Sequence, residues 1–140
     1  MYTPTQHLYL KPADRVVIPK SVLNLVQHHG IYIGHDEFGQ HWFAENHHLS
    51  GVRLVPAEQF LRGISEVTRV QRFIGCEQQR RNAVNFAMSM VGRPYDLLTY
   101  NCEHYSNQVQ HGKPDSDQVK AGFVVTGLLL AMFGGIAALR

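Results

Sequence analysis

The sequence predicts an α+β fold in which a small antiparallel sheet packs against helices and a hydrophobic helix follows near the C-terminal end. Three observations predict it. Short runs of β-branched and aromatic residues, separated by turn residues, fill the first half of the 140 residues. Apolar residues then recur with a helical period over residues 77–91. An uncharged apolar stretch occupies residues 121–139.

Turn and breaker residues divide the first half of the chain into five expected strands. Pro19 ends the first run, and residues 35–39 join the second run to the third as a hairpin. A short helix is expected at residues 56–62, with Pro56 at its first position and Gly63 beyond its end. The five expected strands cover residues 14–18, 30–34, 40–44, 52–55 and 66–73.

Two longer helices are expected in the second half. The first covers residues 77–91, where Gly92 and Pro94 follow the apolar repeat and end the helix. The second covers residues 102–110, because Asn101 is a favoured N-cap residue. The sheet is expected to pack against both helices.

A membrane helix is expected near the C-terminal end. As a helix, residues 121–139 would reach about 28 Å, which is close to the hydrocarbon thickness of a bilayer. The stretch has no polar face, which argues against a buried helix in a globular core. Lys120 and Arg140 bracket it. The chain is therefore expected to divide into a globular domain over residues 1–116 and a membrane-anchoring helix over residues 117–140.

Composition excludes several classes of protein. Thirteen basic and eleven acidic residues give a formal charge of +2, without a basic run, so nucleic acid is not an expected partner. Two cysteines cannot form a disulfide framework. The first five residues lack the basic-then-apolar layout of a secretory signal peptide.

Cys102 is the candidate nucleophile. If Asn101 caps the second helix, Cys102 lies in its first turn, where the helix dipole favours a thiolate. The free N–H groups there also bind an oxyanion as it develops. The alternative is an inert buried cysteine. Cys76 also opens an expected helix, but no histidine lies beside it in sequence, so it is interpreted as structural or incidental.

Two histidines are candidate partners of this cysteine. His28 precedes the strand over residues 30–34, and His41 lies within the facing strand. Cross-strand neighbours are about 5 Å apart, so His28 and His41 are expected to converge on one face. A thiolate, a base and a group that orients the base form a set for thiol catalysis. His29 and His35 remain alternatives for the two histidine positions.

A zinc site is the alternative use of these cysteine and histidine residues. The cysteine and histidine pattern contains no CxxC or HxxxH spacing, so neither a structural nor a catalytic metal is expected. The residues considered as ligands are Cys102, His104, His28, His29, His47 and His48.

Four stretches, in the same order along the chain, resemble the lecithin:retinol acyltransferase family. The strand with sequence HHGIYIG and the segment NCEHY carry its most specific motifs. The family, which includes small phospholipid-metabolising thiol acyltransferases, is a circularly permuted branch of the NlpC-type, papain-like superfamily. The four stretches are residues 11–17, 28–34, 101–105 and 112–119.

The resemblance implies a role for each site residue. Cys102 would be the nucleophile and His28 the base that takes its proton. His41 would be the second histidine, which orients His28. Residues 1–116 would then form the catalytic domain.

The implied activity is that of a phospholipase and acyltransferase. A glycerophospholipid ester would acylate Cys102, and water, an amine or an alcohol would take the acyl group. The resemblance implies no metal and no organic cofactor. The expected partners are the phospholipid substrate and membrane lipid, with the catalytic domain facing the cytoplasm. Two alternatives are a thiol peptidase or amidase of the same superfamily and a non-catalytic membrane-anchored module.

Overall fold

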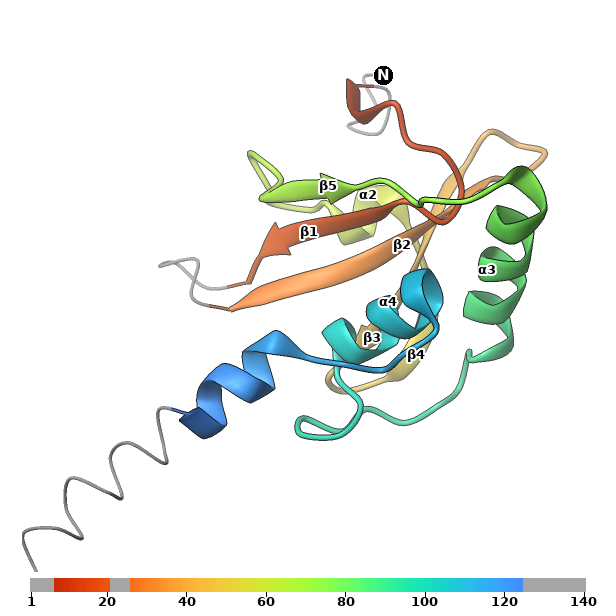
Figure 1. Cartoon of the computed structure of the whole chain (residues 1–140). Coiled ribbons are helices and arrows are strands. Elements are labelled where there is room, and N and C mark those ends of the chain that lie inside the picture. The colour runs from red at the N-terminus through yellow and green to blue at the C-terminus, as the bar shows by residue number, and fades with distance from the viewer. Residues whose placement is uncertain (1–6, 21–25, 125–140) are drawn as a thin grey trace, which may run out of the picture.

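The computed structural model describes residues 7–20 and 26–124, which are built around a five-stranded antiparallel sheet (Figure 1). The strands lie in the order β4-β3-β2-β1-β5. They are β1 (Arg15–Pro19), β2 (Gln27–His35), β3 (His41–His47), β4 (Gly51–Pro56) and β5 (Arg69–Gln71). Each overlaps its predicted range, so the predicted antiparallel sheet is confirmed.

The helices predicted over residues 56–62, 77–91 and 102–110 are also confirmed. A short helix, α2 (Ala57–Phe60), follows β4 directly, with Pro56 as its N-cap residue. The two longer helices are α3 (Glu77–Ser89) and α4 (Cys102–His111). Gly112 ends α4 in the left-handed conformation, with φ of 75°, which glycine adopts at no steric cost.

The sheet buries apolar side chains on both faces. On one face Ile31 and Ala44 pack with residues of α3 and α4, including Ala87 and Tyr105. On the other face Tyr32 and Phe43 pack with α2 and the loop that follows it. Figure 1 shows α4 crossing the sheet over β2 and β3, with α3 alongside. This arrangement places the N-terminus of α4 at the end of the sheet where β2 begins.

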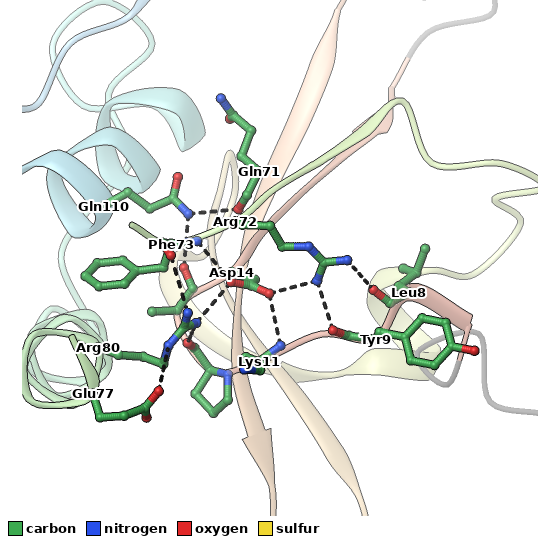
Figure 2. Close-up of polar contacts among 12 residues, drawn as sticks. Leu8, Tyr9, Lys11, Asp14, Gln71, Arg72, Phe73, Glu77, Arg80 and Gln110 are labelled. Carbon is green, nitrogen blue, oxygen red and sulfur yellow. Dashed lines mark hydrogen bonds and ion pairs between the residues drawn. The ribbon is translucent and has the colours of Figure 1, made fainter. Parts of the chain in front are cut away.

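Asp14, just before β1, ties together three segments that are distant in sequence (Figure 2). Its side chain is almost fully buried and accepts hydrogen bonds from the amides of Lys11 and Phe73. It also forms ion pairs with Arg72 at 2.9 Å and Arg80 at 3.0 Å. Burial raises the pKa of Asp14, but these two amides and two guanidinium groups outweigh it, and the pKa lies below its usual value.

The C-terminal part of the chain is described only as far as Val124. Residues 117–124 are helical, and Phe123 and Val124 are each 62% exposed. Within the described ranges, no helix is long and apolar enough to cross a membrane. Most of the predicted membrane helix, residues 125–139, lies outside the described residues, as does residue 140.

Candidate active site

Cys102 is the first residue of α4, as its capping sequence predicts. The Asn101 side chain accepts hydrogen bonds from the amides of Glu103 at 2.9 Å and His104 at 3.1 Å. The Tyr105 amide donates to the Asn101 carbonyl at 3.1 Å. The Cys102 amide has no hydrogen-bond partner among the described residues. It is therefore available to stabilise an oxyanion beside the sulfur.

The imidazole of His28, near the start of β2, is adjacent to this thiol, which is one of the groups that raise its pKa. Its side chain is largely buried, and its Nε2 atom lies 2.6 Å from a carboxylate oxygen of Glu45. The other ring nitrogen, Nδ1, is buried without a hydrogen-bond partner in the described part of the chain. The thiol itself donates weakly to the Gln27 carbonyl oxygen at 3.8 Å. His28 Nδ1 is thus the ring nitrogen that is left to accept the proton of Cys102.

The electrostatics favour a charged His28. Burial lowers the pKa of its imidazole, but the adjacent Cys102 thiol and Glu45 carboxylate raise it to about 9. Burial raises the pKa of Glu45, yet His28 and Arg53 bring it below its usual value. At neutral pH the pair is therefore an imidazolium hydrogen-bonded to a carboxylate, beside a cysteine sulfur.

Glu45 was not predicted from the sequence, and strand register places it. It lies opposite Gly30 in the β2–β3 pairing, so it shares a face with His28 two residues away. Arg53 of β4 donates to the second carboxylate oxygen, at 2.9 Å from Nε. One signal in the sequence could have identified it. Side chains along β3 alternate between the two faces of the sheet, and Glu45 is an acidic residue on the face that His28 occupies. The hairpin register, however, cannot be read from composition.

Gly30 allows an aromatic ring to support His28. A Cβ atom at Gly30 would lie 2.6 Å from the Phe60 ring, so only glycine fits without a shift. Phe60 consequently packs close to β2, with its ring centroid 5.7 Å from that of His28. The His28 ring is held between this contact and the Glu45 hydrogen bond.

The structure does not bring His41 to the position that its predicted orienting role requires. His41 pairs with His35 at the far end of β2, seven residues and about 23 Å from His28 along the strand. Its Nδ1 atom lies 2.6 Å from the Tyr32 hydroxyl. The partner of His28 Nε2 is Glu45. The structure therefore brings together Cys102 and His28 but not His41.

The alternative histidines also lie outside this constellation. His29 points to the opposite side of β2, where its Nδ1 atom accepts from Arg15 Nε at 2.8 Å. Burial and the neighbouring charge of Arg15 lower the pKa of His29 to about 2, so it stays neutral. His35 is exposed at the hairpin turn. Across the described ranges, no group of three or more histidine, cysteine or acidic side chains is arranged to hold a metal ion.

Two cavities adjoin the Cys102–His28 pair. The first, called the Cys102 cavity, has a volume of about 380 Å³ and is bounded partly by residues of the helix at 117–124. Its apolar lining residues include Val26, Leu97, Leu98, Val119 and Phe123. The second, called the His28 cavity, has a volume of about 210 Å³ and is lined by charged and polar side chains as well as apolar ones. Lys20 lines both.

A comparison with protein families gave a match that covers most of the chain. A family model described as a permuted papain-like amidase enzyme, YaeF/YiiX, C92 family, matches residues 12–109 of the 140-residue chain. The matched segment runs from just before β1 into α4 and includes Cys102, His28 and Glu45. A search of curated proteins gave no match. The family match supports the predicted permuted papain-like superfamily, but it does not single out the lecithin:retinol acyltransferase branch.

Proposed function

Because the chain belongs to the permuted papain-like amidase family, we propose that it is a thiol-dependent amidase that cleaves an amide of an apolar acyl group. The observation that carries this proposal is the Cys102, His28 and Glu45 constellation. The amidase alternative thus replaces phospholipid ester cleavage as the principal hypothesis.

The proposed cycle begins with the Cys102 sulfur attacking the acyl carbonyl carbon. The free amide of Cys102 stabilises the oxyanion. The carbon–nitrogen bond then breaks, and His28 gives its proton to the leaving nitrogen, which produces an amine and an acyl thioester. A water molecule attacks the thioester while His28 accepts its proton. The acid leaves, and the Cys102 sulfur is released.

Glu45 acts in this cycle as a positioning residue. Its hydrogen bond at 2.6 Å fixes the Nε2 side of His28, which leaves Nδ1 toward the sulfur. Its negative charge favours the imidazolium that each proton transfer requires. The apolar lining of the Cys102 cavity supports an aliphatic acyl group as the part of the substrate beside the sulfur.

The phospholipase and acyltransferase activity is retained as a second candidate. The same apolar cavity accepts the acyl chain of a glycerophospholipid ester, and the thioester intermediate is common to both activities. Phe123 and Val124, exposed near the cavity, and the uncharged run at residues 121–139 support a membrane-anchoring role for residues 117–140. Membrane lipid is then the proposed partner.

Intact-protein mass spectrometry tests the proposed function. The purified chain is mixed with N-decanoylglycine or with phosphatidylcholine, quenched in acid and weighed. We expect a decanoyl adduct that hydroxylamine removes. Cys102→Ala abolishes it, whereas Cys76→Ala, which removes the exposed second cysteine, retains it. An adduct from phosphatidylcholine alone would favour the second candidate. The absence of any adduct on folded protein would contradict both.

A further inference from the structure

The two cavities divide the reacting pair between them. Cys102 lines the first cavity, whereas His28 and Glu45 line the second. Lys20, which follows β1, lines both, so the two cavities are neighbours at this residue. A substrate that reaches Cys102 can therefore extend into the apolar Cys102 cavity or into the more polar His28 cavity.

The chemistry of the proposed cycle assigns one direction to each part of the substrate. The acyl carbon must reach the Cys102 sulfur, and the leaving nitrogen must reach the proton on His28. The acyl group then extends into the Cys102 cavity. The leaving group departs on the His28 side, toward the second cavity.

The charges of the His28 cavity do not balance. Glu45 is its one acidic lining residue, and its carboxylate already pairs with His28 and with Arg53, whose Nη2 atom lies 2.8 Å away. The Lys20 ammonium group has no acidic partner within 4 Å among the described residues, and it lies 3.4 Å from Nδ1 of the His48 ring. Burial and the Arg53 charge lower the pKa of His47, which therefore adds no charge at neutral pH. An unneutralised ammonium group remains.

We infer that the His28 cavity binds the leaving group of the substrate and that Lys20 selects a leaving amine carrying a carboxylate or phosphate group. The inference rests on the proposed function and adds a substrate class to it. The volume of about 210 Å³ suits an amine of amino-acid or phosphoethanolamine size. Gln59, at the same cavity, supplies a neutral amide for further hydrogen bonds.

Three amides with one acyl chain test the inference. They are N-decanoylglycine, N-decanoylphosphoethanolamine and the uncharged N-decanoylethanolamine. We expect kcat/KM at pH 7 to be about five- to tenfold higher for at least one anionic amide than for the uncharged one, as a single partly screened ion pair supplies. The anionic amide that reacts faster identifies the carboxylate or the phosphate as the recognised group.

Substitutions at Lys20 complete the test. In Lys20→Gln we expect the ratio of anionic to uncharged kcat/KM to fall close to one, and in Lys20→Glu to fall below one. Lys11→Gln is the matched control, because Lys11 is exposed and lies beyond the opposite end of β1. Circular dichroism verifies that each variant is folded.

The outcomes separate the two proposals. Acylation of Cys102 at equal rates by all three amides, or an unchanged ratio in Lys20→Gln, would overturn the inference and leave the amidase proposal standing. A failure of all three amides to acylate a folded protein would overturn both.

Discussion

At the residue scale, the site depends on three side chains from three elements. Cys102 begins α4, His28 is the second residue of β2, and Glu45 lies on β3. The helix supplies the free amide, and the sheet supplies the charged pair. Cys102 and His28 were predicted because each lies in a local sequence motif. Glu45 has no such motif, since its role comes only from the strand pairing.

Replacing Glu45 by Gln tests whether this carboxylate controls His28. We expect kcat/KM to fall by about 10²-fold, in the range that one proton-transfer group contributes. The pKa of His28, about 9 in the intact protein, should also fall, because a charge that raises it is lost. If the reactive pair is thiolate and imidazolium, the alkaline limb of the pH–rate profile then moves to lower pH.

His41→Ala is the matched control for this variant. His41 is hydrogen-bonded to Tyr32 away from the site, so we expect its kcat/KM and pH profile to stay close to those of the intact protein. If His41→Ala were inactive while Glu45→Gln kept both its rate and its alkaline limb, the assignment of Glu45 as the positioning residue would be wrong.

At the element scale, much of the fold was predictable because each segment carries its own signals. Asn101 caps α4, Pro19 and Gly63 mark ends, and a clear helical period runs through α3. The register of β2 against β3 was not predictable. The strands extend beyond the apolar residues that predict them. A shift in the strand register between Tyr32 and Gly34 also changes which residues of β2 and β3 lie opposite each other. That register decides which residue of β3 shares a face with His28, whereas the hairpin connection itself places His41 opposite His35, at the other end of β2.

Asp14→Ala tests how the segment before β1 is held to β5 and α3. The change leaves the Arg80 guanidinium, only 12% exposed, without its buried partner, so we expect a loss of about 3–5 kcal/mol in the free energy of unfolding. Urea denaturation at pH 7 measures it. Glu37→Ala, in the exposed hairpin turn, should change stability by less than about 0.5 kcal/mol.

The pH dependence of this loss provides a second test. The pKa of Asp14 is lower in the folded protein than its ordinary value of 3.8. The stabilisation is therefore fully present above that value and disappears as the pH falls through the folded pKa. The difference between Asp14→Ala and the intact protein should shrink in acid. A difference that stays constant down to pH 2 would show that packing, rather than charge, holds this segment.

At the scale of the whole molecule, the helix at residues 117–124 belongs partly to the active site. The Gln118 amide donates to Glu103 of α4 at 3.1 Å, and Ser116 donates to the same carboxylate at 2.6 Å. Val119 and Phe123 line the Cys102 cavity. The predicted boundary at residue 116 therefore separates the cavity from one of its walls. A boundary after Val124 keeps that wall.

Two truncated chains distinguish these boundaries. A chain ending at Val124 should hydrolyse a dispersed decanoyl amide with a KM close to that of the full chain, because it keeps every lining residue of the Cys102 cavity. A chain ending at Ser116 loses Val119 and Phe123, and we expect its KM to rise about tenfold, as burial of one or two apolar groups supplies. Its kcat should change less, since Cys102, His28 and Glu45 remain. Steady-state kinetics on both chains, after circular dichroism has shown that they are folded, makes the comparison. Equal KM values would show that the helix at residues 117–124 contributes nothing to acyl binding and would leave membrane anchoring as its proposed role.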